Sequence, residues 1–269
     1  MTGRVSCAID DGVATVVLDN PAKRNAMTTQ MWSALPPLLD SLAGNPDVRV
    51  VVVTGAGDSF SAGADISTLT GLTPGEPMPA TLAEDALVAF PKPVVAAIRG
   101  WCVGGGCQLA VACDLRVSEE SARFGITPAK IGVVYPARTT ARLVELVGPA
   151  AAKFLLFTGD FVDAERALRI GLVDELVPVG GLDARVAELA RTLASRSQLT
   201  QHAAKDLIHA ALAGQPLTER YRRWAGEGRA ELAEGVAAFA ERRAPEFPWR
   251  PPAPARPDRA VPVEGPARP

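Results

Sequence analysis

The stretch GWCVGGGCQLAVACD, from Gly100 to Asp114, decides the fold that we expect for this chain. Three consecutive glycines, Gly104 to Gly106, come directly before an apolar run of helical character. Glycine lets another group approach the backbone closely, and the first N–H groups of a helix have no partner within it. The first strongly hydrogen-bonding side chain after the glycines is an amide, Gln108, and not an acid. We therefore expect this turn to bind an electron-rich atom with backbone N–H groups.

A second turn of the same kind, GAGDSFSAGADI from Gly55 to Ile66, follows another predicted strand. Both preceding strands, VRVVVVTG and PVVAAIRG, are short and apolar, which is typical of strands covered on both faces. Neither turn has the G-x-G-x-x-G spacing of a dinucleotide site or the Gly-Lys-Ser/Thr of a phosphate loop. Two amides that converge from separate turns suit a carbonyl oxygen that becomes an oxyanion. Tight packing of strand on helix would explain either turn equally well.

Composition and charge exclude several classes of protein. The formal net charge of −2 gives no electrostatic footprint for nucleic acid or an anionic membrane. The four cysteines form no C-x-x-C pair and lie in apolar runs, so we expect buried free thiols in a reducing cytosol. No apolar run approaches the roughly 20 residues of a membrane span, and the N-terminus has no signal-peptide core. The sequence predicts a cytoplasmic protein.

Only two histidines are present, His202 and His209, and both lie late in the chain within a helical pattern. A zinc site or a histidine-based catalytic triad is therefore disfavoured, and we expect no metal ligands. Their spacing of seven residues is typical of two positions on one helix face.

The order of patterns predicts an α/β core followed by helices. Two strands flank the hairpin signature Asp10-Asp11-Gly12, and residues 28–43 form a helix that Pro36 and Pro37 interrupt or kink. After about residue 140 the pattern is mostly helical. The segment 244–269 holds nine prolines in 26 residues, which is typical of disorder. We expect three parts: a core, a helical region and a proline-rich, largely disordered tail, at 1–195, 196–243 and 244–269.

Five segments resemble, in order and spacing, the motifs of the crotonase (enoyl-CoA hydratase/isomerase) superfamily across roughly residues 5–250. They are NPAKRNAMT, FSAGADI, KPVVAAIRGWCVGGGCQLAVACDLRV, ARFG…P…IG and EGVAAFAERRAPEFPWR. The resemblance implies a spiral of stacked ββα units with C-terminal helices that assemble a homotrimer or a dimer of trimers. It also implies a coenzyme A thioester as substrate, with no separate cofactor. The amides of Ala64 and Gly105 would form the oxyanion hole.

The resemblance also implies a set of residues that hold coenzyme A. Lys23 or Arg24 would lie near phosphate and Ala26 would lend its backbone carbonyl. The second turn and the C-terminal helix add Ala62, Asp65, Ile66, Arg242 and Arg243 to the set. Each charged residue could equally be a solvated surface residue, and Asp65 could be the N-cap of a following helix.

The sequence departs from the family where its hydratases carry two glutamates. One position is occupied by Gln108, and counting back from Gly132 places Pro128 at the other. Neither side chain can exchange a proton near neutral pH, so hydration by the two-glutamate route is disfavoured. Gln108 could instead act as a capping-box partner of its helix, or orient a water or a substrate carboxylate.

An oxyanion hole alone stabilises an enolate, which decarboxylation of a malonyl-type thioester produces without a strong base. The segment TPAKIGVVYP resembles that of methylmalonyl-CoA decarboxylases, in which a tyrosine follows Thr-Pro. Tyr135 is then the residue that positions the carboxylate or donates a proton, although it could also be a core aromatic. One departure is Ala64, where the bacterial decarboxylase has a histidine. The alternatives are a double-bond isomerase with a base such as Glu84 or Asp85, a weak enoyl-CoA hydratase, and a non-catalytic acyl-CoA-binding protein.

Overall fold

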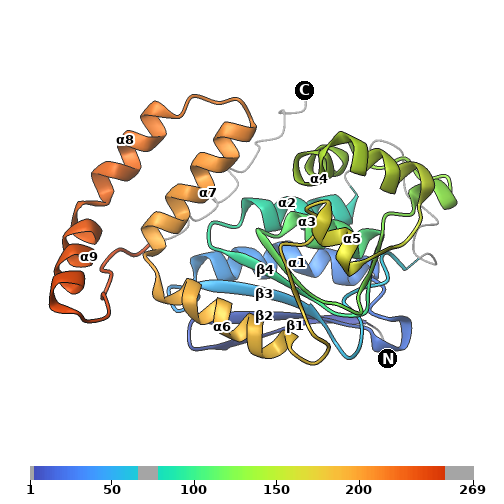
Figure 1. Ribbon diagram of the computed structural model, residues 1–269, viewed down its shortest axis with the longest axis horizontal. Helices are drawn as coiled ribbons and strands as arrows, with labels where there is room; N and C mark the ends of the chain where they lie inside the picture. Colours follow the sequence, from blue (N-terminus) through green and yellow to red (C-terminus); the bar gives the residue numbers. More distant parts are fainter. Residues whose placement is uncertain (1–2, 66–77, 252–269) are drawn as a thin grey trace, which may run out of the picture.

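A six-stranded sheet forms the centre of the molecule, and the computed structural model describes it within residues 3–65 and 78–251 (Figure 1). Its order is β1-β2-β3-β4-β6-β9, in which β1 and β2 form an antiparallel hairpin and the remaining pairs are parallel. The strands are β1 (Arg4–Asp10), β2 (Val13–Asp19), β3 (Val50–Gly55), β4 (Val94–Ile98), β6 (Leu115–Glu119) and β9 (Glu175–Val177). The predicted hairpin at Asp10-Asp11-Gly12 is confirmed.

A second, three-stranded sheet explains the spiral. Its order is β5-β7-β8, with β5 (Trp101–Val103), β7 (Arg123–Gly125) and β8 (Val162–Asp163). Successive units therefore place one strand in each sheet: β4 then β5, and β6 then β7. Each pair is followed by a helix, α3 (Gly105–Ala112) after β5 and α4 (Ala137–Thr158) after β7. This alternation produces the stacked ββα architecture.

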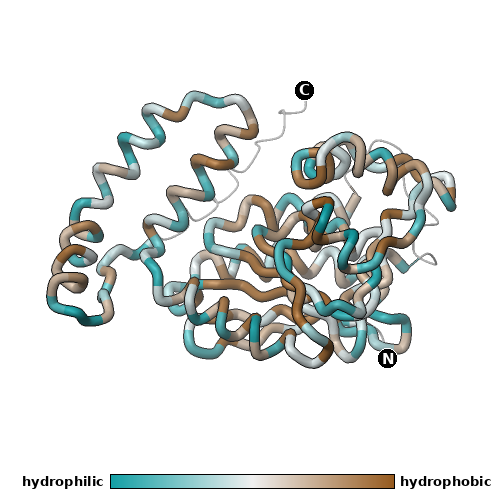
Figure 2. The backbone as a smooth tube through the Cα atoms, viewed as in Figure 1, coloured by the Kyte–Doolittle hydropathy of each residue, from teal (hydrophilic) through white to brown (hydrophobic). Residues whose placement is uncertain are grey.

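Helices cover both faces of the central sheet, which is why its strands are almost continuously apolar. Along β3, Val51 and Val53 face a core shared with α1 (Thr29–Gly44), α2 (Pro79–Ala89) and α3. Val50 and Val52 face the opposite core, formed with α6 (Leu182–Ser195). Figure 2 shows the hydrophobic colour concentrated in the strands between these layers. The double coverage agrees with the strand pattern read from the sequence.

Helix α1 runs through both of its prolines as a single helix, so the expected interruption is wrong. Each proline lacks an N–H and would normally disrupt the helix. Pro37 is exposed, however, whereas the opposite side buries an apolar stripe that includes Met31, Leu35 and Leu39. Packing of this stripe keeps the helix intact, and water can satisfy carbonyl groups on the exposed side.

Three further helices form an arm that extends from the core, as Figure 1 shows. They are α7 (Gln198–Leu212), α8 (Thr218–Glu227) and α9 (Arg229–Glu241), and the short α5 (Ala164–Arg169) lies in the core before α6. Residues 244–251, part of the expected disordered tail, are described and contact the arm. Trp249 donates its backbone N–H to Glu231 at 2.8 Å and packs edge-to-face on His202. The rest of that tail lies outside the described residues.

The described part of the chain gives two further findings. None of its helices combines the length and the apolar character that crossing a membrane requires. Within the same residues, no cluster of three or more His, Cys, Asp or Glu side chains could hold a metal ion. The cysteines are free thiols, and Cys102, Cys107 and Cys113 are buried, as the sequence predicts.

Candidate active site

The first glycine turn is held beside the second by backbone pairing. Ser61 forms an isolated parallel bridge with Cys102, and its N–H donates to the Trp101 carbonyl at 2.8 Å. The Ser61 carbonyl accepts the Val103 N–H at 2.9 Å. The segment after β3 therefore runs along β5 up to the start of α3, which brings the two turns into one place.

Glycine is required where these turns meet. Gly104 has a φ of 53° and Gly63 a φ of 102°, both in the region that favours glycine. A methyl group built on Gly63 would lie 3.3 Å from the Gly105 nitrogen, and one built on Gly105 would lie 3.5 Å from the Ala64 nitrogen. The amides of Ala64 and Gly105 are therefore neighbours across the gap between the turns.

Three of the amides around this pair already have acceptors. Gly63 N–H donates to the Ser61 hydroxyl at 3.2 Å, Asp65 N–H to the Met27 carbonyl at 2.9 Å, and Gly104 N–H to the Gly125 carbonyl at 2.8 Å. Within residues 3–65 and 78–251, neither the Ala64 nor the Gly105 amide donates a hydrogen bond. Two available donors at adjacent positions can hold one oxygen that gains negative charge.

Gln108 lies one turn into α3 and is only 7% exposed. Its side chain lines a cavity of about 10 Å³ together with Glu84 and Tyr135. The capping-box interpretation is wrong, because the N-cap residue is Gly104 and its N–H donates to Gly125. Gln108 therefore lines this cavity instead of closing the end of its helix.

Tyr135 reaches the same turn from the segment that precedes α4. A methyl group built on Gly104 would lie 4.0 Å from the Tyr135 hydroxyl oxygen and 3.9 Å from the Thr127 hydroxyl oxygen. Burial raises the pKa of Tyr135 well above its usual range, so its phenol stays protonated. Pro128 is buried at the start of a short 3-10 helix, Pro128–Lys130. The side chains that lie near Gly104 from this segment are thus two hydroxyl groups, those of Thr127 and Tyr135.

Glu84 is the acid that lines the cavity with Gln108 and Tyr135. It lies on α2, is 1% exposed, and its Oε2 accepts hydrogen bonds from Thr139 Oγ1 at 2.6 Å and Arg142 Nη1 at 3.2 Å. Burial raises the pKa of Glu84, an effect that these two bonds oppose. The neighbouring Asp85 also pairs with Arg142 but is not one of the residues that line the cavity.

The loop expected to hold coenzyme A lies next to the second turn, at residues 55–66. Lys23 pairs with Asp65 at 2.7 Å, while the guanidinium of Arg24 lies 5.4 Å from the centre of the Trp101 ring. The carbonyl of Ala26 accepts the Asn20 side-chain amide at 2.8 Å. Ala62 N–H donates to the Arg24 carbonyl at 2.8 Å, which ties the loop to the turn. Ile66, and any helix that Asp65 would cap, lie outside the described residues.

The basic pair at the end of α9 lies apart from these residues within one chain. Figure 1 places α9 at the far end of the arm, on the opposite side of the molecule from α4. Arg243 pairs with Glu234 and Glu241, each at 2.6 Å, and Arg242 is the left-handed residue that ends the helix. The structure of a single chain therefore does not bring Arg242 and Arg243 to the oxyanion turns.

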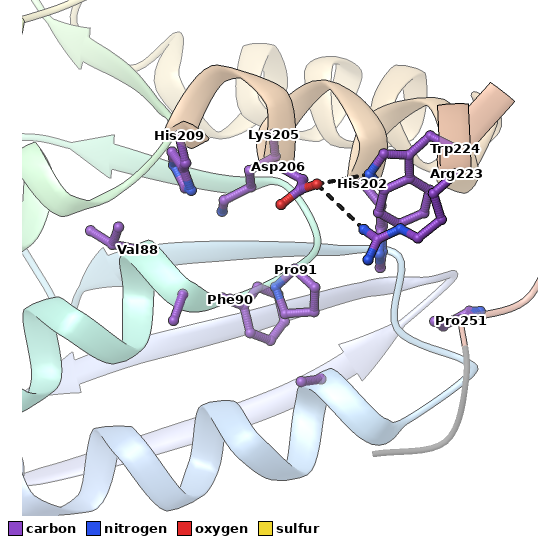
Figure 3. A pocket seen from close by; sticks show the side chains of 12 residues that line it. Val88, Phe90, Pro91, His202, Lys205, Asp206, His209, Arg223, Trp224 and Pro251 are labelled. Atoms are coloured by element: carbon purple, nitrogen blue, oxygen red, sulfur yellow. Dashed lines mark hydrogen bonds and ion pairs between the residues drawn. The ribbon is translucent and has the colours of Figure 1, made fainter. Parts of the chain in front are cut away.

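A larger recess of about 360 Å³ lies between the arm and the core (Figure 3). Its cationic side chains already have acidic partners: Lys205 pairs with Asp114 at 2.7 Å, and Arg223 with Asp206 at 3.4 Å. Trp224 donates its ring N–H to the same Asp206 at 2.8 Å. Because its charges are compensated and it lacks the two glycine turns, we do not place the chemistry there.

Sequence reasoning missed three side chains of the site, namely Thr127, Thr139 and Arg142. Glu84 was named, but only as an alternative base. The available signal was the pair Glu84-Asp85, which supplies the only charged residues of the otherwise apolar helix α2. No local pattern pairs these acids with α4, because the partners of Glu84 are 55 and 58 residues further along the chain.

Comparisons with known proteins relate the whole chain to one family. The family model described as enoyl-CoA hydratase/isomerase matches residues 8–250. A Thermus thermophilus protein named as a candidate enoyl-CoA hydratase is 40% identical over 248 residues, covering 87% of this chain and 97% of the relative. The (E)-benzylidenesuccinyl-CoA hydratase of Thauera aromatica is 34% identical over 256 residues, covering 90% of this chain and 98% of that one. A crystal structure of an enoyl-CoA hydratase/isomerase family member superimposes with a TM-score of 0.88 at 41% identity, covering 94% of this chain and 99% of that one.

Proposed function

This chain belongs to the enoyl-CoA hydratase/isomerase family, and on that premise we propose that it converts an acyl-CoA thioester through an enolate. The amides of Ala64 and Gly105 hold the thioester oxygen as it becomes the enolate oxygen. The observation that carries the proposal is that these two neighbouring N–H groups are available, whereas the N–H groups of Gly63, Asp65 and Gly104 are bonded. Preorganised donors of this kind cost no reorganisation when the charge develops.

We propose decarboxylation of a malonyl- or methylmalonyl-type thioester as the reaction. The positions of the two family glutamates hold Gln108 and Pro128, so a route that needs two carboxylates has no support in this site. In decarboxylation the C–C bond breaks, CO2 leaves, and the bond electrons pass into the enolate held by the two amides. The hydroxyl of Tyr135 and the amide of Gln108 are neutral groups that can orient the substrate carboxylate before it leaves.

The coenzyme A part of the substrate would bind along the loop that contains Lys23, Arg24 and Ala26, next to the Ala62–Asp65 turn. The backbone N–H groups of Ala62 and Asp65 donate to the carbonyls of Arg24 and Met27, and these bonds support the proposal because they hold the loop against the turn. The proposed reaction needs no cofactor beyond the coenzyme A of the substrate itself.

We also propose that the chain assembles as a homotrimer or a dimer of trimers through its arm. Helices α7, α8 and α9 with residues 244–251 surround a groove of about 870 Å³ that is mostly apolar. On α9, Phe239 is 87% exposed and Leu232 is 70% exposed. Exposed apolar patches of this size are typical of protein interfaces.

The experiment that tests the reaction is a panel of malonyl-, methylmalonyl- and crotonyl-CoA with the purified protein. Release of CO2 with formation of acetyl- or propionyl-CoA is the expected result. Loss of the enoyl absorbance of crotonyl-CoA without CO2 release from the other two would replace decarboxylation by hydration. Binding of all three without turnover would identify a non-catalytic acyl-CoA-binding protein.

One observation favours a double-bond isomerase as the second candidate. Glu84 lines the same small cavity as Gln108 and Tyr135, and it is the one carboxylate among the residues described there. A single acid can move a proton between two carbon atoms of an enoyl thioester. Interconversion of 2-enoyl- and 3-enoyl-CoA, followed by chromatography, would reveal this activity.

A further inference from the structure

We propose that Glu84 is the proton donor to the α-carbon of the bound enolate, acting through one water molecule held between Glu84, Gln108 and Tyr135. The inference rests on the proposed enolate chemistry, because it names the source of the proton which that chemistry leaves open. It assigns a function to an acid that lies on α2, a helix outside both glycine turns.

The cavity has the size that a single water needs, and its mostly apolar lining includes the polar groups of Glu84, Gln108 and Tyr135. Its volume is about 10 Å³, and a water requires roughly that much space together with two to four polar partners. Both hydrogen bonds to Glu84 end on Oε2, so within the described residues Oε1 is the oxygen left for the cavity. The Gln108 amide and the Tyr135 hydroxyl supply the other partners. The same hydroxyl lies 4.0 Å from a methyl group built on Gly104, so the cavity adjoins the oxyanion turn.

Two side chains of α4 prepare Glu84 for this task. The Thr139 hydroxyl donates to Oε2 at 2.6 Å and Arg142 Nη1 donates at 3.2 Å. These bonds fix the orientation of the carboxyl group and stabilise the carboxylate that remains after the proton leaves. Burial acts in the opposite direction and raises the pKa of Glu84, which keeps the protonated form accessible. The remaining charged groups that face this network are Asp85 on α2 and Arg138 on α4, which pair with each other at 3.0 Å.

The transfer balances without any further reactant. The electron pair of the enolate C=C bond takes a proton from the water, and the water takes the proton of the Glu84 carboxyl group. The thioester carbonyl reforms at the two amides, and Glu84 is left as a carboxylate. Glu84 regains a proton from solvent after the product leaves. In reverse, the Glu84 carboxylate removes an α-proton through the same water.

The alternative is that Glu84 only anchors α2 to α4. Exchange of the α-protons of propionyl-CoA in D2O separates the two, because this thioester has no carboxylate to lose and reports proton transfer alone. Mass spectrometry follows the incorporation of deuterium. We expect Glu84→Gln to exchange at least about 100-fold more slowly than the wild type, since general acid–base catalysis contributes 100- to 10,000-fold.

Asp85→Asn is the matched control. Asp85 is the next residue of the same helix and binds the same Arg142, but it does not line the cavity. We expect this variant to keep the wild-type exchange rate. If Asp85→Asn slowed exchange as much as Glu84→Gln, the ion-pair network would be the cause and the proposal would be overturned.

The pH profile gives a readout that an anchoring role would not change. Exchange begins with the carboxylate, so the wild-type rate should rise with pH through the pKa of Glu84. Glu84→Gln should lack this rise with pH, and Glu84→Asp should retain it. The aspartate variant keeps the test valid if the glutamine variant unfolds. If Glu84→Gln kept the wild-type exchange rate and pH profile while Gly105→Val lost exchange, the role of Glu84 would be overturned. The proposed enolate chemistry would stand. Absence of exchange in the wild type would overturn the enolate chemistry itself.

Discussion

The core and the arm of this molecule differ in the exposure of their apolar side chains. Strands β3 and β4 bury theirs almost completely, since Val51, Val94 and Ile98 are all 0% exposed. On α9 the apolar residues Leu232, Val236 and Phe239 lie mainly in solvent in the single chain. The core is therefore complete within one chain, whereas the arm presents a surface that another chain can cover. This difference predicts that changes in the core turns affect chemistry, and changes in the arm affect assembly.

The largest expected effect concerns the chemistry of the core. Two-carboxylate hydration needs acids at the positions that hold Gln108 and Pro128. We expect the wild-type protein to hydrate crotonyl-CoA at least about 1000-fold more slowly than a family hydratase, because general acid–base catalysis is worth 100- to 10,000-fold. Steady-state assays of both enzymes at equal concentration check this. Turnover at the rate of an ordinary hydratase would show that the site contains an acid pair elsewhere.

Gly105→Val tests the oxyanion turn directly. A Cβ at this position would lie 2.9 Å from the Trp32 ring and 3.5 Å from the Ala64 nitrogen, so a branched side chain fills the space where the oxygen would bind. We expect turnover to fall by about 100-fold or more, as for the loss of an oxyanion donor.

The matched control for that variant lies in the arm. Gly226→Val makes the same change on α8, where an added Cβ meets nothing within 4 Å. We expect it to keep the wild-type turnover. Equal losses in the two variants, or normal activity in Gly105→Val with an unchanged melting temperature, would contradict the assignment of the hole.

The arm predicts an effect on assembly. Leu232→Glu together with Phe239→Glu places two charges on the exposed apolar side of α9, and burying them in an interface would be costly. We expect sedimentation to show a trimer or hexamer for the wild type and a single chain of 28.1 kDa for the double variant. The exposed polar change Glu219→Gln on α8 should leave the assembly intact. A wild-type protein that sediments as one chain would refute the proposed role of the arm.

The smallest expected effect is the loss of folding stability at acid pH that His202, on α7 of the arm, causes. Burial, together with the charges of Lys92 and Lys205, lowers the pKa of His202 to about 4. Between pH 6.5 and 4 the unfolded chain therefore binds a proton that the folded chain does not, so folding stability falls as the pH falls through this window.

His202→Phe should remove this part of the acid sensitivity while keeping a ring against Trp249. We expect its melting temperature to drop a few degrees less than that of the wild type between pH 7 and pH 5. The difference in melting temperature between the two proteins at pH 8, where His202 is neutral in both the folded and the unfolded chain, supplies the baseline. Parallel curves would show that His202 does not titrate on unfolding.

Much of the fold could be predicted because its signals are local. The Asp10-Asp11-Gly12 turn between alternating runs specifies a hairpin, and the continuous apolar run of β3 indicates a strand covered on both faces. Helix α1 could not be predicted correctly from local rules. Its two prolines favour interruption, and only the packing of residues such as Leu35 and Leu39 on the sheet keeps it continuous.

The sequence by itself determined the family, the two glycine turns and the absence of carboxylates at positions 108 and 128, since each depends on residues close together in the chain. Only the tertiary structure decided which side chains lie around the proposed enolate site. Glu84 contacts Thr139 and Arg142, which are 55 and 58 residues further along the chain, because α2 packs against α4. Both helices also pack against α3. Such a contact depends on how helices pack, which no short stretch of sequence specifies. The sequence offered Glu84 and Asp85 as candidate acids, and only the packing of the helices showed that Glu84 lines the cavity beside Gln108 and Tyr135.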